Sequence, residues 1–185
     1  MDSATTIART GFTLNGASVS LDAPPGEPLS QALRERLGAR DVKVGCGAGD
    51  CGACTVLIDG APVCACLTPT AQAEGRAVET LTGLHQSPEG ERLAASFAAH
   101  QAAQCGICTP GMMVSAVALL RAGGPVEPQT VEDALGGVLC RCTGYRKIVD
   151  AVVDAAGGGA SVASADGAVG DAIPRLDGAA KIDGT

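Results

Sequence analysis

Nine cysteines are the residues of this 185-residue sequence most able to do chemistry, and they gather in two regions, 46–66 and 105–142. An odd number of clustered cysteines does not fit the disulfide framework of a small secreted domain. Thiols this close together are typical of metal ligands or redox groups in a reducing compartment. The sequence therefore predicts two thiolate-based centres.

The first region places three cysteines in one glycine-rich loop. Four residues separate Cys46 from Cys51, two separate Cys51 from Cys54, and eleven separate Cys54 from Cys66. Plant-type ferredoxins hold a 2Fe–2S cluster with this spacing. Glycines let such a loop adopt positive φ and turn backbone N–H groups toward the cluster. We predict that these four cysteines bind one 2Fe–2S cluster.

Two alternatives stay open at this first region. Cys64 lies two residues before Cys66, on the same strand face if the segment is extended, and competes with it as the fourth ligand. We favour Cys66, because a turn at Asp59-Gly60 can return it to the loop, and we interpret Cys64 as a buried or free thiol. Zinc is the second alternative, although zinc ligands usually come as two pairs.

The second region holds two cysteine pairs, Cys105/Cys108 and Cys140/Cys142. Two pairs also suit zinc. However, only Arg141 separates the second pair, which is unusual for zinc, and both pairs precede predicted helices whose N-termini favour anionic thiolates. Disulfides within such short pairs would be strained. These residues alone favour a second iron–sulfur cluster over zinc and leave both open.

Three motifs resemble the iron–sulfur subunit of the xanthine oxidase family of molybdenum hydroxylases. They are the loop at 45–56, QCGICTPG at 104–111 and LCRCTGY at 139–145, and the likeness covers roughly residues 10–155. The resemblance implies a second 2Fe–2S cluster at Cys105, Cys108, Cys140 and Cys142. It also implies an α+β fold, in which a plant-type ferredoxin-like β-grasp domain is followed by a four-helix bundle.

The resemblance further implies contact with a molybdopterin cofactor held by a large partner subunit. Gln104 and Cys142 stand at the positions that lie against the pterin in this family. An amide can hydrogen-bond the edge of a heterocycle, although Gln104 without the family would be an ordinary exposed glutamine. Electrons would pass from molybdenum through the second cluster and then the first, to FAD on another subunit or to an acceptor such as a cytochrome.

The resemblance has one departure and one extension. Val138 stands where the family often has Asn, so a local side-chain hydrogen bond is absent there. Residues 174–184 resemble the start of the molybdopterin-binding subunit, so the chain is either a piece of a fused protein or a subunit with a docked tail. We predict a ferredoxin-like β-grasp domain at 1–84, a helical 2Fe–2S domain at 85–156, and a linker and tail at 157–185 that docks on the molybdenum subunit.

Turn and helix signals place these loops. Alternating residues around Asn15-Gly16 and Asp59-Gly60 predict two hairpins. A short helix is expected at 29–37, ended by Gly38, and a last strand at Val78–Leu81. Four helices should follow. The first spans 89–101, and the second is capped by Thr109 and runs to Leu120. The third begins at a capping box formed by Thr130–Asp133, and the fourth spans 145–156.

The remaining residues carry weaker signals. His85 and His100 have no ligand-spaced partner and are interpreted as surface residues. Met112 and Met113 follow a helix start and are interpreted as packing. Arg141 could offset cluster charge or face a partner.

Composition restricts the partners. The net charge of −7 argues against nucleic acid, which requires a basic face, and no apolar run is long enough to cross a bilayer. Residues 1–12 lack the apolar core of a signal peptide, so a cytoplasmic location is expected, and export with a signal-bearing partner is compatible with it.

The prediction is an electron-transfer subunit of a molybdenum-dependent oxidoreductase, without substrate chemistry of its own. A free-standing ferredoxin and a structural zinc module are the competing hypotheses.

Overall fold

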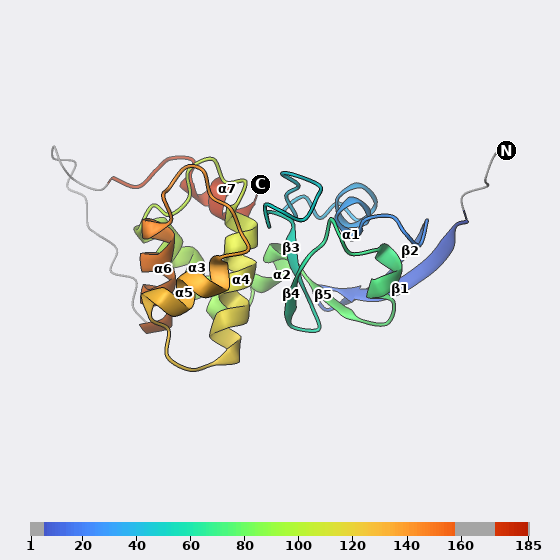
Figure 1. The fold of residues 1–185 in the computed structure, drawn as a ribbon, viewed down its shortest axis with the longest axis horizontal. Coiled ribbons are helices and arrows are strands. Elements are labelled where there is room, and N and C mark those ends of the chain that lie inside the picture. The colour runs from blue at the N-terminus through green and yellow to red at the C-terminus, as the bar shows by residue number, and fades with distance from the viewer. Residues whose placement is uncertain (1–5, 158–172, 185) are drawn as a thin grey trace.

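The computed structural model describes residues 6–157 and 173–184, in which a mixed sheet and a helical region lie side by side (Figure 1). Nearly all of the Gly-, Ala- and Ser-rich linker predicted from residue 157 lies outside the described residues. The expected α+β class is confirmed, because the strands precede the long helices along the chain. Among the described residues, no helix is both long and apolar enough to cross a membrane.

The sheet has five short strands in the order β2-β1-β5-β3-β4. In chain order these are β1 (Ala8–Leu14), β2 (Ala17–Ala23), β3 (Thr55–Ile58), β4 (Ala61–Cys64) and β5 (Ala77–Glu79). Both predicted hairpins are confirmed, and Asn15 and Asp59 have φ of 51° and 50°, as such two-residue turns require. β5 runs parallel to β1 and antiparallel to β3, which joins the two hairpins into one sheet.

The short helix expected after the first hairpin packs its apolar side on the sheet. It begins as α1 (Leu29–Gln31) and continues as a wider π-helical turn, Ala32–Arg36, and Gly38 follows with a φ of 71°. Leu29 and Leu33 are fully buried with Val56 and Ile58 in one apolar cluster. A 3₁₀ turn, Thr70–Ala73, then leads to β5.

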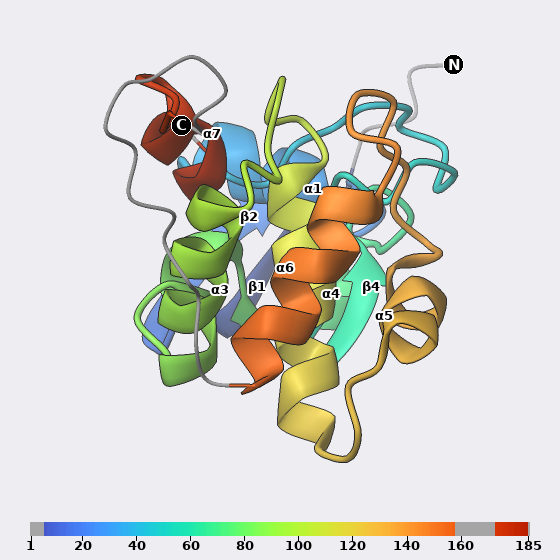
Figure 2. The same ribbon diagram turned by 90° about the vertical axis from the view of Figure 1, so that its left-hand side faces the viewer.

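The helical region contains five helices before the undescribed linker. They are α2 (Leu81–Leu84), α3 (Pro88–Ala99), α4 (Thr109–Ala122), α5 (Pro128–Leu135) and α6 (Arg146–Gly157). In Figure 2, α6 lies between α3 and α5, with α4 behind it, and the four helices enclose one apolar cluster. Met112 and Met113 are fully buried in it, which confirms their packing role.

Three predicted element boundaries are wrong, two of them beside a proline and one where a residue packs among the helices. Cys108, rather than Thr109, is the N-cap of α4, which leaves Pro110 in the first turn. The third helix starts at Pro128, before the expected capping box, because proline suits the first turn of a helix. The last strand ends at Glu79, because Leu81 begins α2 and is buried among the helices.

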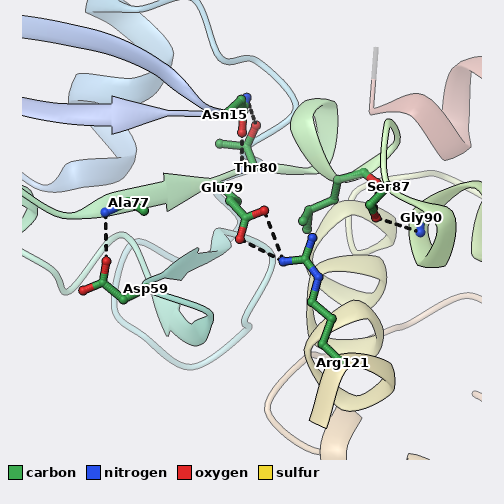
Figure 3. Close-up of polar contacts among 9 residues, drawn as sticks. Asn15, Asp59, Ala77, Glu79, Thr80, Ser87, Gly90 and Arg121 are labelled. Atoms are coloured by element: carbon green, nitrogen blue, oxygen red, sulfur yellow. Dashed lines mark hydrogen bonds and ion pairs between the residues drawn. The ribbon is translucent and has the colours of Figure 1, made fainter. Parts of the chain in front are cut away.

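The sheet and the helices make direct contact through α4, which packs against β3. Arg121 on α4 donates to both carboxylate oxygens of Glu79 on β5, at 3.1 and 2.9 Å (Figure 3). Asn15, in the first hairpin turn, accepts a hydrogen bond from the backbone N–H of Thr80 at 2.8 Å and donates to its hydroxyl at 3.1 Å (Figure 3). The two regions are therefore held in a defined orientation by packing and by polar contacts.

Candidate iron–sulfur centres

The loop between the π-helical turn and β3 forms the first candidate centre. Gly47, Gly49 and Gly52 have φ of 68°, 82° and 66°, the left-handed region that other residues rarely occupy. This backbone turns the N–H of Ala48 toward Cys46 Sγ, at 3.3 Å. Hydrogen bonds from the backbone of Ala48 and then Cys51 lower the pKa of Cys46 to about 6. The loop therefore favours a thiolate at an exposed position, as a metal ligand requires.

The other two predicted ligands of this centre, Cys54 and Cys66, lie together on its buried side. The N–H of Cys66 donates to Cys54 Sγ at 3.4 Å, across the β3–β4 hairpin. Burial raises the pKa of Cys54 to about 12. A bound metal reverses this preference, because a coordinating thiol is deprotonated by the ion's own charge. The N-terminus of α1 holds the Cys66 segment, since Leu29 N–H donates to Thr68 O at 2.8 Å.

Cys64 lies beside the same group of thiols. It is half-buried, and its thiol donates to Gly49 O at 3.8 Å. Burial, followed by the neighbouring Cys66 thiol, raises the pKa of Cys64. Cys64 therefore lies close enough to the other thiols to compete with Cys66 as the fourth ligand.

The second centre joins two segments at one end of the helices. Cys108 caps α4, and Cys140 lies in the loop between α5 and α6. Burial, followed by contact with Cys140, raises the pKa of Cys108 to about 12. A hydrogen bond with Cys105 raises the pKa of Cys142, and both of these thiols are exposed. The four predicted ligands are therefore brought together as an inner pair and an outer pair.

Two residues beside the second centre, Thr143 and Tyr145, hold its loop in place, and no role was predicted for either of them from the sequence. Thr143 Oγ1 lies 3.1 Å from Cys140 Sγ, and the hydroxyl of Tyr145 accepts the N–H of Cys140 at 2.9 Å. Burial opposes ionisation of Cys140, but hydrogen bonds from Thr143, from the Cys142 backbone and from Cys108 together lower the pKa of Cys140. The TGY sequence directly after the cysteine pair was the available signal.

The two residues predicted to face a pterin lie at the exposed end of this centre. Gln104 and Cys142 are both exposed, and Gln104 directly precedes Cys105 in the outer pair. Val138, by contrast, is only 2% exposed and packs in the helical core. The backbone at Val138 is held by the Tyr145 hydroxyl, which donates to its carbonyl at 3.5 Å. The Tyr145 hydroxyl therefore hydrogen-bonds this segment, which the apolar Val138 side chain cannot do.

The described tail, 173–184, lies against this chain's own helices. It ends in α7 (Gly178–Asp183), whose Ile182 is buried in the helical core, and Arg175 donates to Ala103 O at 3.3 Å. Gly106, between two predicted ligands, has a φ of 86° and lies under Lys181. The tail therefore covers one side of the loop that carries Cys105 and Cys108.

The interpretation of the two histidines as ordinary surface residues is wrong. His100 Nε2 lies 3.1 Å from Asp154 Oδ2, so it links α3 to α6. His85 Nε2 is buried without a hydrogen-bond partner and lies 3.8 Å from Asp183 Oδ1 in the tail. Both histidines are partly buried contacts between elements, and neither lies at the thiol groups.

The arrangement of the thiols fits a 2Fe–2S cluster better than a single ion. Within residues 6–157 and 173–184, no three His, Cys, Asp or Glu side chains converge closely enough to hold one metal ion. A structural zinc gathers four ligands around one point, whereas a 2Fe–2S cluster spreads four cysteines over two irons. The pairs at both centres match the second requirement.

Comparison with known proteins identifies both regions. Residues 12–82 match the family of 2Fe-2S iron-sulfur cluster binding domains, and residues 80–153 match the [2Fe-2S] binding domain. The xanthine dehydrogenase iron-sulfur-binding subunit of Escherichia coli O157:H7 is 44% identical over 145 residues, which are 77% of this chain and 90% of that protein. The chain belongs to the iron–sulfur proteins of the xanthine oxidase family of molybdenum hydroxylases.

Solved structures of this family agree with the fold. Quinoline 2-oxidoreductase from Pseudomonas putida 86 superposes with a TM-score of 0.78 at 42% identity, over 83% of this chain and 96% of that chain. Aldehyde oxidoreductase from Desulfovibrio desulfuricans superposes with a TM-score of 0.86 at 40% identity, over 95% of this chain but 21% of that much longer one. As in its family, the sheet is therefore a ferredoxin-like domain, and each region is a 2Fe–2S-binding domain.

Proposed function

We propose that this chain relays electrons between a molybdenum centre on a partner and an acceptor, through one 2Fe–2S cluster in each region. The observation that carries the proposal is the pairing of the thiols. Each centre has an inner, more buried pair and an outer, more exposed pair, and the two centres meet through contacts between their loops. Such an arrangement suits one-electron transfer through the protein.

The proposed ligands follow from the geometry. Cys46 and Cys51 would hold one iron of the first cluster, and Cys54 and Cys66 the other. At the second centre, we assign the outer pair Cys105/Cys142 and the inner pair Cys108/Cys140. The clusters, when bound, supply the one-electron redox chemistry. The surrounding elements correspond to a β-grasp domain, 1–84, and a four-helix bundle built from α3 to α6 within 85–156.

The residues around the thiols set the properties of each centre. Backbone N–H groups of the first loop stabilise negative charge on the thiolates and so favour the reduced state. Thr143 serves the same purpose at the second centre through its contact with Cys140 Sγ, whereas the Tyr145 hydroxyl accepts the Cys140 N–H and holds the backbone. Their hydroxyls also fix the ligand loop, which keeps the distance between redox groups constant.

The outer pair of the second centre defines the proposed contact with the molybdenum partner. Cys105, Cys142 and Gln104 are exposed there together with the apolar side chains of Ile107 and Leu139, which are 49% and 57% exposed. We propose that this surface meets the molybdopterin-binding subunit, with Gln104 and Cys142 against the pterin. The described tail, which lies against the helices beside the Cys105 loop, would contact that subunit with its exposed side.

The electrons would leave from the first centre, whose Cys46 is exposed. The acceptor would be a flavin subunit carrying FAD or an external protein such as a cytochrome. We propose a cytoplasmic location, because free thiols remain available as ligands in a reducing compartment.

Metal and flavin analysis of the native complex, isolated through a tag on this chain, tests the proposal. We expect about four irons per molybdenum, as two 2Fe–2S clusters require. Flavin in the same preparation would identify a flavin subunit as the exit for electrons. Iron without molybdenum or a large partner would instead indicate a free-standing ferredoxin, and a colourless protein containing zinc would refute the iron–sulfur assignment.

A further inference from the structure

The described tail packs on this chain's own helices next to the second centre. α7 contacts α3 and α4 (Figure 2), and its Ile182 is only 4% exposed within the helical core. A Cβ on Gly106 would lie 3.0 Å from Lys181 Cδ and 3.4 Å from its Cα. α7 therefore lies directly over the loop at 105–108, which carries two of the proposed cluster ligands.

The last turn of α7 lies where the sheet region, α2 and α4 meet. Gly184 is its C-cap, and a Cβ there would lie 3.1 Å from Asp41 Cβ and 3.2 Å from Pro110 Cγ. Asp41 in turn accepts the backbone N–H of Thr82, in α2, at 2.8 Å. The end of α7 is therefore placed beside α2.

One polar contact between α2 and α7 is incomplete. His85, the C-cap of α2, has its Nε2 atom buried without a hydrogen-bond partner among the described residues, which is an unfavourable state for a polar group. Asp183 Oδ1, in the last turn of α7, lies 3.8 Å away, too far for a hydrogen bond but within the range of an ion pair. Protonation of His85 adds a positive charge that Asp183 attracts, and so strengthens the contact between α2 and α7.

The other charged groups near this contact leave Asp183 as the partner of a charged imidazole. The elements packed around it carry Asp41, Glu89, Glu91, Arg92, Arg121 and Lys181. Arg92 pairs with Glu89 at 3.9 Å, and Arg121 pairs with Glu79 on β5. Glu91 is exposed, Asp41 is hydrogen-bonded to α2, and Lys181 lies over the ligand loop. Within the described residues, Asp183 has no ion pair other than the one with His85.

We propose that α7 is a proton-controlled latch over the loop at 105–108, with His85 as the group that binds the proton and Asp183 as its ion-pair partner. The inference rests on the proposed function, because the covered loop belongs to the second cluster. When the imidazole takes up a proton from solvent, the ion pair holds α7 in place and keeps the loop covered. Loss of that proton weakens the contact and gives water access to the loop. Imidazole changes charge between about pH 5 and 8, and the step transfers one proton and no electron.

Hydrogen exchange of the native complex, with both clusters loaded, tests the latch between about pH 5.5 and 8. Protection factors are compared, because they correct for the intrinsic pH dependence of amide exchange. We expect those of the α7 amides to fall by about two- to fivefold as the pH rises, since an ion pair with an exposed partner is weak and the Asp183 side chain is 56% exposed. The amides of 104–108 should change in parallel.

Two substitutions and a matched control assign the effect to this contact. His85→Gln and Asp183→Asn each abolish the ion pair and keep a polar side chain, so both should make the protection of α7 independent of pH. His100→Gln is the control, because it removes the other partly buried histidine–carboxylate contact, with Asp154, and should keep the wild-type pH dependence. A merely structural role of His85 would lower the protection in His85→Gln at every pH and leave its pH dependence unchanged.

The outcomes separate this inference from the proposed function. Protection of α7 that does not change with pH in an iron-replete wild type would refute the latch and leave the relay intact, as would a wild-type pH dependence in His85→Gln. If His85→Gln loses iron or unfolds, Asp183→Asn decides, because it changes a largely exposed side chain, and a retained pH dependence there would equally refute the latch. A wild-type protein without two redox-active clusters would overturn the proposed function itself.

Discussion

Three of the four predicted ligands at the first centre come from a nine-residue loop, whereas thirty-one residues separate Cys108 from Cys140 at the second. The first centre therefore depends on local backbone conformation, which three glycines at positive φ provide. The second depends on the packing of α3 to α6, which brings two distant loops together. A perturbation of the loop and a perturbation of the core should consequently damage different clusters.

Loss of a ligand should have the largest effect. We expect Cys54→Ser and Cys108→Ser each to lose one cluster and so about half of the four irons that two 2Fe–2S clusters contain. Electron paramagnetic resonance of the reduced protein should show which signal remains. Cys64→Ser is the matched control and should keep both signals. If Cys64→Ser instead loses the first signal and Cys66→Ser keeps it, Cys64 is the ligand.

The thiols of the iron-free protein should differ in reactivity by orders of magnitude, because only the thiolate is nucleophilic. Cys46 has a pKa of about 6, whereas burial raises the pKa of Cys54 and of Cys108 to about 12. Iodoacetamide at pH 7 should therefore modify Cys46 first, at a rate that falls as the pH drops below about 6. Peptide mapping measures this, and rapid labelling of Cys54 or Cys108 in the folded protein would contradict the burial argument.

The lowered pKa of Cys46 also makes the stability of the folded iron-free chain depend on pH. The pKa of Cys46 in the folded chain lies below its ordinary value of 9.0. Ionisation therefore stabilises the folded iron-free chain most fully above about pH 9, and this contribution is lost as the pH falls through about 6. Replacing Cys46 with serine should remove that part of the pH dependence.

Core truncations should be next in size and should separate the two regions. Leu33 and Leu93 are both fully buried, one under the sheet and one in α3. Leu33→Ala and Leu93→Ala should each lower the free energy of unfolding by about 2–5 kcal/mol. Leu33→Ala should weaken retention of the first cluster and Leu93→Ala that of the second, as measured by iron release during denaturant titration. Equal loss of both clusters in both variants would show that the two regions unfold as one unit.

Removal of single hydroxyls should have the smallest effect. Tyr145→Phe leaves the N–H of Cys140 and the carbonyl of Val138 without their partner, a cost of about 1–3 kcal/mol. Thr143→Val, which removes the hydroxyl 3.1 Å from Cys140 Sγ, should lower the reduction potential of the second cluster and leave that of the first unchanged. Thr68→Val, which removes a hydroxyl bonded to Cys64 O, is the matched change at the first centre. A potential shift at the wrong cluster in either variant would contradict the assignment.

Local signals in the sequence were sufficient for much of the fold. Asn15-Gly16 and Asp59-Gly60 predicted both hairpins, because few residue pairs tolerate positive φ at adjacent positions. The helix starts were harder. Thr109 and Thr130 looked like caps, but Cys108 and Glu127 occupy those positions, since the prolines that follow fix the first turn. A proline in the first turn therefore set these helix starts in place of the predicted threonine caps.

Sequence alone determined the type of ligand, the spacing of the first loop and the membership of a family, because these depend on covalent neighbours. Only the tertiary structure brought Ile182 into the helical core and Leu139 to Cys51. Each of these contacts joins backbone or side-chain groups whose partners are selected by packing between elements. The pairing of the thiols and the contact between the two centres arise from that packing, and no pattern of neighbouring residues contains it.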